Sequence, residues 1–488
     1  MKNLRRLMRL TLAFLPAACA SSPPTETPAL GIPTPGGWTA PGKVDDGAPS
    51  NDPGWWKTFG DSGLDTAIEE CLRNNHDLRI AAVRVDRAEA QASSSGADRL
   101  PTLRLQADGA KSQRNFIGFP IPGMQGIPRN RFSNYGAALN LSWELDIWGR
   151  VRSASSAALA DQEAALADFH GARLSLVGQT CKAWFASLEA TRQAELAQAT
   201  VENYRSSEKQ VRERYERGLR SALDLRLARA NLATAEDNLE ATRARKDGAI
   251  RQLELLLGRY PAGALKTASR LPEVPGKVPA GLPSELLARR PDIQALQRRL
   301  AAQEERLYQA RVSLLPRISL SGSTGTSSNE LQDILDRDFS VWSLAANLFQ
   351  PLFQGGKLLA GLDLADTNVR EALESYVKNA LRAFGEVEGA LALETYLARR
   401  EAALTRAVEQ SQSARELAED RYARGLDGII TLLSAQRDAF RSESQLLQVQ
   451  RLRLDARVDL HLSLGGGFTR TEDGQIDKNP VVFAEERP

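Results

Sequence analysis

Two runs of about 70 residues without a proline limit what this chain can fold into more than any other feature of its sequence. They cover residues 149–218 and 356–425, and each closes on the pattern Arg-Tyr-x-Arg-Gly-Leu, at residues 214–219 and 421–426. Apolar residues recur in both runs at spacings of three and four, which is typical of helices that pack side by side. At about 1.5 Å per residue, each run predicts a helix of about 100 Å, far longer than a globular domain needs.

The rest of the chain repeats in the same order around these runs. The segment Arg290-Pro291-Asp292-Ile293 corresponds to Asn75-His76-Asp77-Leu78, and Leu315-Pro316 corresponds to Leu100-Pro101. A single helix over about residues 64–98 opens the first repeat and ends at the first Leu-Pro pair. We therefore predict one architecture built twice. The predicted boundaries are a first repeat at 64–258, a Pro-rich linker at 259–282, a second repeat at 283–464 and a C-terminal tail at 465–488.

Each repeat also contains two segments in which apolar and polar residues alternate: residues 103–109 and 134–145, then 318–323 and 342–348. Alternation predicts strands with one apolar and one polar face, of the length that a tilted strand needs to cross a bilayer. Four such strands cannot close a barrel, because an open sheet edge in lipid leaves backbone groups unsatisfied. Closure therefore requires further copies: two chains would supply eight strands and three would supply twelve. A soluble β-sandwich is the alternative to a barrel.

The N-terminus has the pattern of an export signal. Four basic residues, no acid and a short apolar run fall within residues 1–18, which predicts a signal peptide too short to be a transmembrane helix. The segment Leu15-Pro16-Ala17-Ala18-Cys19 resembles a bacterial lipobox, which predicts lipid modification of Cys19; Pro16 stands where leucine is usual, and ordinary cleavage near Ala18 or Ala20 is the alternative. A Ser/Pro/Thr-rich tether, residues 19–63, follows and would link the lipid anchor to the folded body.

Composition excludes several classes of protein. The 488 residues are 42% hydrophobic and 25% charged, as in an ordered protein, and the net charge of +2 gives no indication of nucleic-acid binding. Cys71 and Cys181 remain after Cys19, and we expect both to be buried apolar thiols and not a disulfide or a metal site. Neither a metal nor a cofactor is expected.

Several further stretches are similar to the TolC-like outer-membrane factors, and within them to the NodT/OprM-like efflux outer-membrane lipoproteins. The resemblance covers nearly the whole chain after the signal peptide, with its most specific motif at residues 278–293. It is supported by Trp55-Trp56, residues 75–78, both Arg-Tyr-x-Arg-Gly-Leu patterns, residues 351–356 and residues 464–468. The sequence departs from the family pattern at Gln297, Phe468 and Ser434.

The resemblance implies a mixed α and β membrane protein with four transmembrane β-strands per chain. Three chains would complete a 12-stranded trimeric β-barrel, continued by a long α-helical barrel in the periplasm. It implies an outer-membrane location in a Gram-negative bacterium, contact with outer-membrane lipid, and partners in a periplasmic adaptor and an inner-membrane pump of the resistance-nodulation-division type. The implied function is passive exit of small molecules in a tripartite efflux system; a type I protein secretion channel is the alternative.

The two glycine-containing patterns are predicted to be helix tips, with Gly218 and Gly425 ending the helices. The resemblance implies that the surrounding residues contact the adaptor. The predicted tip residues are Arg214, Tyr215, Gly218, Ser221, Asp224, Arg421, Tyr422 and Gly425.

Just past the second tip, residues 432–437 read Leu-Leu-Ser-Ala-Gln-Arg, where family members commonly have Asp at the third position. The resemblance implies a periplasmic gate here, held shut in the family by that Asp and the Arg. With Ser434 in place of the acid, no charge-assisted bond can form at that position. Three Arg437 side chains near the axis would then either repel one another or find Asp224, Glu443 or a backbone carbonyl. We expect closure to rely more on Ile430 and Leu433, with Arg437 making the opening anion-tolerant and not cation-selective.

Two other classes of function can be weighed against a channel. An enzyme is disfavoured, because the three histidines are scattered and the sequence has no nucleophile elbow, metal-ligand cluster or phosphate loop. A passive periplasmic spacer or adhesin would have the long helices but no need of strands of bilayer length. Trp143, Trp148 and Trp342 are equally compatible with an interfacial aromatic belt and with core packing.

Overall fold

The computed structural model describes residues 28, 31, 36–40, 54–115, 117, 127, 129–266, 270–276, 278, 281 and 283–466. The predicted signal peptide, the lipidation at Cys19 and most of the tail lie outside the described residues. The chain forms two compact units, one with Met1–Pro28, Asp86–Ala165 and Leu296–Ser375, and the other with Ala29–Val85, Leu166–Ala295 and Tyr376–Pro488. Each unit therefore draws segments from both predicted repeats.

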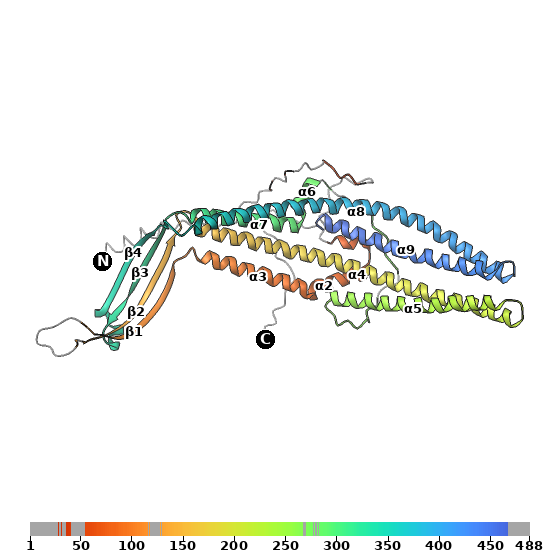
Figure 1. Cartoon of the computed structure of the whole chain (residues 1–488), viewed down its shortest axis with the longest axis horizontal. Coiled ribbons are helices and arrows are strands. Elements are labelled where there is room, and N and C mark those ends of the chain that lie inside the picture. Colours follow the sequence, from red (N-terminus) through yellow and green to blue (C-terminus); the bar gives the residue numbers. More distant parts are fainter. Residues whose placement is uncertain are drawn as a thin grey trace. The chain divides into compact units, whose positions relative to one another are not determined.

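The first unit contains one antiparallel four-stranded sheet in the order β1-β2-β3-β4 (Figure 1). Its strands are β1 (Thr102–Asn115), β2 (Arg129–Leu145), β3 (Arg317–Ser328) and β4 (Ser340–Phe349). Both predicted hairpins are present, and pairing of β2 with β3 joins the two repeats. The first hairpin is longer than predicted, because backbone pairing continues through polar residues that lack the apolar alternation, up to the pair Asn115 and Arg129. Two 3-10 turns, η3 (Leu331–Leu335) and η4 (Arg337–Phe339), connect β3 and β4.

The long helices occur where the sequence predicts them and match in length between the repeats. Helices α4 (Arg150–Glu216) and α8 (Lys357–Ala423) have 67 residues each. Their return helices, α5 (Ala222–Leu256) and α9 (Ile429–Ser463), have 35 residues each. Among the described residues, no helix combines the length and the apolar character needed to span a bilayer.

The single helix predicted over residues 64–98 is wrong, because the structure has two: α2 (Ser62–Asn74) and α3 (His76–Ala97). The cause is Asn75, whose side-chain oxygen accepts hydrogen bonds from the backbone N–H groups of Asp77 (2.9 Å) and Leu78 (3.2 Å). This N-cap ends one helix and starts the next. The corresponding segment of the second repeat is also a junction, between α6 (Pro283–Arg289) and α7 (Pro291–Val312).

An apolar core of the second unit lies where α2 and the start of α3 pack on α4, α5 and α9. The short helix η2 (Trp55–Phe59) places three aromatic rings in it, and Trp55 stacks on His461 with ring centres 4.7 Å apart. Cys71 and Cys181 belong to this core, and both are buried free thiols, as predicted.

Of the predicted tether, residues 19–63, the structure describes residues 28, 31, 36–40 and 54–63, and η2 belongs to the core and not to a tether. Residues 36–40 are also held against the same unit. The indole N–H of Trp38 donates to the carbonyl of Gly281 (2.9 Å), and the backbone N–H of Thr39 donates to Glu388 of α8 (2.8 Å). This segment is therefore docked on the folded body and does not act only as a spacer.

Candidate functional site

Both predicted tips are helix ends of the same geometry. At the end of α4, the N–H of Gly218 donates to the carbonyl of Tyr215 (2.8 Å) and the N–H of Leu219 donates to that of Arg214 (2.9 Å). The end of α8 repeats this pattern around Gly425. This is the Schellman arrangement, in which the residue after the helix is left-handed. Gly218 and Gly425 have φ values of 73° and 77°, so both positions favour glycine.

The two tips are held together by an arginine of the first and a tyrosine of the second. The guanidinium of Arg214 lies 5.1 Å from the centre of the Tyr422 ring and donates to the backbone carbonyls of Tyr422 (2.9 Å) and Ala423 (2.7 Å). Arg220 lies 5.0 Å from the same ring centre. Burial raises the pKa of Tyr422, although both arginines act to lower it. The ring is a cation–π partner of two charges and is only 1% exposed.

The corresponding tyrosine of the first tip has a different environment. Tyr215 is 42% exposed, although it occupies the same position of the same motif as Tyr422. The position that corresponds to Arg220 is Asp427 in the second tip, and Asp427 forms an ion pair with Arg421 at 2.6 Å. Arg421 is therefore paired within its own tip, whereas Arg214 reaches across to the other.

The remaining predicted tip residues stabilise the start of α5. Ser221 is the N-cap of this helix, and its hydroxyl accepts a hydrogen bond from the backbone N–H of Asp224 (3.2 Å). Asp224 lies in the first turn, where a negative charge favours the helix dipole. Behind the tips, one apolar cluster joins α4, α5, α8 and α9. Its members include Val201, Tyr204, Val211, Leu225, Ala228, Leu239, Tyr422, Ile429, Leu432 and Leu433.

The four predicted gate residues have different environments within the chain. Leu433 belongs to the apolar cluster behind the tips and is 7% exposed, whereas Ile430 is 67% exposed. Ser434 is partly buried. Arg437 is exposed and lies 3.8 Å from Asp438, its ion-pair partner within the chain. Its expected environment near the axis of an assembly stays a prediction.

Two residues that hold the helices together at the tips were not predicted from the sequence. Gln436 is 1% exposed, and its amide donates to Ser207 of α4 and to Glu419 of α8, both at 3.1 Å. It therefore joins α9 to α4 and α8 beside the predicted gate residues. The other is Arg220, and aligning the two tips would have found it, because this is the position where they carry opposite charges, Arg220 against Asp427.

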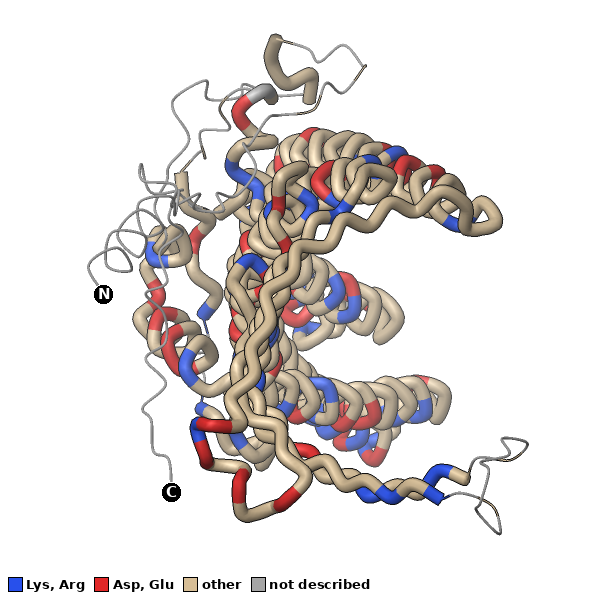
Figure 2. The backbone as a smooth tube through the Cα atoms, turned by 90° about the vertical axis from the view of Figure 1, so that its left-hand side faces the viewer, with Lys and Arg blue, Asp and Glu red and all other residues tan. Residues whose placement is uncertain are grey.

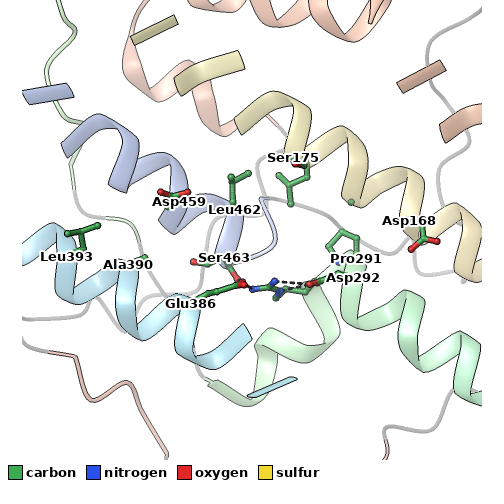
Figure 3. A pocket seen from close by; sticks show the side chains of 13 residues that line it. Asp168, Ser175, Pro291, Asp292, Glu386, Ala390, Leu393, Asp459, Leu462 and Ser463 are labelled. Carbon is green, nitrogen blue, oxygen red and sulfur yellow. Dashed lines mark hydrogen bonds and ion pairs between the residues drawn. The ribbon is translucent and has the colours of Figure 1, made fainter. Parts of the chain in front are cut away.

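The most specific sequence motif, at Arg290-Pro291-Asp292, lines a cavity of about 680 Å³ between α4, α7, α8 and α9 (Figure 3). Arg290 forms ion pairs with Asp292 (2.8 Å) and Glu386 (2.6 Å) and donates to the carbonyl of Ser463 at the end of α9. Burial raises the pKa of Asp292, but the Arg290 guanidinium, the backbone N–H of Ile293 and the charge of Arg382 lower it, and the net shift is downward. Arg382 also pairs with both acids, so the charges balance and the motif ties helix ends together. Among the described residues, no group of acidic, histidine or cysteine side chains could hold a metal ion.

The model of a protein family described as "Outer membrane efflux protein" matches residues 67–259 and 282–466. The chain belongs to this family. Its relatives include the pyoverdine export outer membrane protein OpmQ of Pseudomonas putida, 33% identical over 95% of this chain and 98% of that protein. The outer membrane protein OprJ of Pseudomonas aeruginosa is 33% identical over 94% of this chain and 95% of that protein. The open-state structure of the Neisseria gonorrhoeae MtrE outer membrane channel is similar with a TM-score of 0.79 at 29% identity, covering 94% and 100% of the two chains.

This membership decides between the classes of function left open by the sequence. The protein is an outer-membrane efflux channel, and the expected family resemblance is confirmed. A passive spacer or adhesin is disfavoured, because the matched relatives and solved structures are named as export proteins and channels.

Proposed function

We propose that three copies of this efflux protein form one duct, with a 12-stranded barrel in the outer membrane and a helical barrel in the periplasm. The observation that carries this proposal is the sheet. In the described part of the chain, β1 and β4 are edge strands that pair on one side only. One face of the sheet exposes large apolar side chains, with Leu105 80%, Trp342 79% and Leu344 75% exposed. Lipid would cover that face, and pairing of β4 with β1 of the next copy would satisfy both edges.

Three copies, and not two, are inferred from the resemblance to TolC-like factors. In this assembly the repeats at 64–258 and 283–464 would alternate around the axis as equivalent building units. The exposed Trp342 would belong to the aromatic belt at the membrane surface. Cys19, which lies outside the described residues, would carry the lipid anchor, and an acylated mature N-terminus in mass spectrometry would support this.

We propose that the tips contact a periplasmic adaptor, which couples the duct to an inner-membrane pump. The duct would act without catalysis of its own. Relatives are named for export of pyoverdine, of solvents and of cations, which favours efflux of small solutes over protein secretion. Because relatives named for such different exported substances belong to one family, we infer that substrate choice lies mainly in the pump.

Two measurements test the assembly and its coupling. Native mass spectrometry in detergent should give the mass of three chains, and a stable monomer would contradict the barrel. A photo-crosslinking residue at Leu219, which is 68% exposed at the first tip, should capture the adaptor in cells. The same residue at Leu359 of α8, which is 61% exposed, is the matched control and should not capture it.

A further inference from the structure

The β1–β2 hairpin extends beyond the rest of the sheet. Its two strands pair as far as Asn115 and Arg129, whereas the pairing of β2 with β3 reaches only Tyr135. Beyond Tyr135, residues 110–115 and 129–134 therefore form a two-stranded ribbon, here called the projecting ribbon. Because α3 precedes β1 and α4 follows β2, the ribbon lies at the end of the sheet opposite the helices. In the proposed membrane placement this end faces the cell exterior.

One face of the projecting ribbon carries only positive charge. Side chains alternate between faces along a strand, so Lys111, Arg129 and Arg131 lie on the same face as Leu105 and Leu139. The register places Lys111 opposite Ser133, Gln113 opposite Arg131 and Asn115 opposite Arg129. Residues 110–115 and 129–134 contain no Asp or Glu. Arg131 donates to the side-chain oxygen of Gln113 at 2.6 Å, and this partner is neutral. Figure 2 shows basic positions gathered at the end of this ribbon.

The order of residues along this face of β2 matches the layers of a membrane. Trp143 and Tyr135 flank an apolar stretch that includes Leu139 and Leu141. Their separation of eight residues corresponds to about 27 Å along the strand and about 20 Å across the membrane after tilting, near the height of a barrel's apolar band. Arg131 lies four residues further out, which adds about 10 Å of depth after the same tilt. This is the depth at which lipid headgroups begin.

The opposite charge marks the other hairpin at the same end of the sheet. The β3–β4 connection carries Glu330, Asp333, Asp336 and Asp338, with Arg337 as its one basic residue. Asp333 accepts a hydrogen bond from Ser328, the partner of Tyr135 in the sheet register. The cationic face is therefore confined to the β1–β2 hairpin, and the β3–β4 connection at the same end of the sheet does not share it.

We propose that Lys111, Arg129 and Arg131 bind the phosphate groups of anionic lipids in the outer leaflet of the membrane. This rests on the proposed placement of the sheet in the outer membrane. A guanidinium presents paired donors that match phosphate oxygens. A phosphorylated lipid fits better than a free anion or a protein partner, because the cations continue the exposed apolar face without a break. One molecule can then cover the apolar side chains with its acyl chains and the cations with its phosphates.

The test measures binding of lipid A with two phosphates to the full-length protein in detergent, by native mass spectrometry. The variant Lys111→Gln/Arg129→Gln/Arg131→Gln removes the three charges, and Arg104→Gln/Arg114→Gln is the matched control on the opposite face of β1. Losing three cations should weaken binding by about 100-fold, and the control should stay within about 3-fold of wild type. Lipid A without phosphates should bind wild type no better than the triple variant binds the phosphorylated form.

Equal binding of phosphorylated lipid A to wild type and to the triple variant would overturn the proposal. Displacement of the lipid by excess inorganic phosphate would also overturn it, because the site would then be a simple anion site. Should the triple variant fail to fold, wild type still decides: raising the salt concentration must weaken binding of the phosphorylated lipid. Channel conductance of the triple variant is measured in parallel. Loss of lipid binding by the triple variant with intact conductance supports this inference and leaves the proposed function untouched. Absence of conductance in wild type would contradict the proposed function.

Discussion

Arg214 of the first tip covers the ring of Tyr422 of the second, with the guanidinium 5.1 Å from the ring centre. The same guanidinium donates to two carbonyls at the end of α8, so one side chain joins the two helix ends. Because Tyr422 is buried and its counterpart Tyr215 is exposed, the tips of one chain form an asymmetric pair. The pair leaves Tyr215 available to a neighbouring copy or to a partner protein.

Removing this arginine should loosen the periplasmic end of the duct. Arg214→Ala deletes a cation–π contact and two hydrogen bonds to carbonyls, which together contribute about 1 to 3 kcal/mol. We expect higher resting conductance in planar bilayers, with trimer yield preserved by the apolar cluster behind the tips. Arg217→Ala, at an exposed position of the same tip, is the control. Arg214 has no role in closure if both variants conduct like wild type.

The tip glycines should be needed for coupling and not for folding. An added Cβ at Gly218 or Gly425 meets no atom within 4 Å, so the cost of Gly218→Val or Gly425→Val is backbone strain of about 1 to 2 kcal/mol. This is enough to reshape a turn but small for the whole protein. Export activity should fall while the protein level stays near wild type. Gly385→Ala, inside α8 and equally unobstructed, should leave both unchanged. If the protein level fell together with export activity, the tip glycines would instead be needed for folding.

Joining of the two repeats in the sheet should depend on Gly325. A Cβ at this position would lie 2.1 Å from the Ala137 carbonyl oxygen of β2, and backbone cannot move aside as a side chain can. Gly325→Ala should therefore separate β3 from β2 and reduce trimer yield several-fold in heat-modifiability gels. Gly322→Ala, in the same strand, has its nearest contact at 3.6 Å and should assemble normally. Normal assembly of both variants would show that this pairing tolerates a side chain.

Two half-buried groups of the second unit should give opposite pH dependences of stability. Burial raises the pKa of Asp455 to about 6, against the effect of Arg451 at 2.5 Å, so the folded state binds more protons than the unfolded state from about pH 4 to 6. Stability then falls as pH rises through that window. Burial lowers the pKa of His461 to about 4, so the unfolded state binds more protons there and stability rises with pH up to about 6.5.

Single variants separate these two slopes. Asp455→Asn should leave a stability that rises by about 2 to 3 kcal/mol between pH 4 and 6.5, and His461→Gln should leave one that falls by a similar amount between pH 4 and 6. Unfolding midpoints in detergent at four pH values are sufficient. Loss of the Trp55 stacking in His461→Gln shifts all midpoints equally, so only the slope is informative. If the unfolding midpoints of both variants changed with pH in the same direction, the assignment of the two opposite slopes to Asp455 and His461 would be refuted.

Periodicity and glycine placement were sufficient to predict the long helices and the hairpins. The ends of α4 and α8 are set by local backbone geometry around Gly218 and Gly425, which a sequence displays directly. The break at Asn75 was missed, because apolar spacing continues across it and only the cap hydrogen bonds of its side chain reveal the junction. The different environments of Tyr215 and Tyr422 were not predictable from an identical motif, because they depend on which arginine crosses to the other tip.

The predicted gate, which no contact within one chain tests, gives a further prediction, which concerns ion selectivity. If position 434 faces the constriction, Ser434→Asp would place a carboxylate one helical turn from Arg437 and allow a charge-assisted bond. Resting conductance should fall and selectivity should shift toward cations. Unchanged conductance and selectivity would place Ser434 away from the constriction.

The central claim is that this chain forms a pore, and recordings of the purified wild-type protein in planar bilayers test it most directly. The account predicts discrete conductance steps that scale with the number of inserted trimers. It also predicts that Arg214→Ala raises the fraction of time spent open. Absence of conductance steps from correctly assembled wild type, and also from Arg214→Ala, would contradict a duct through the outer membrane.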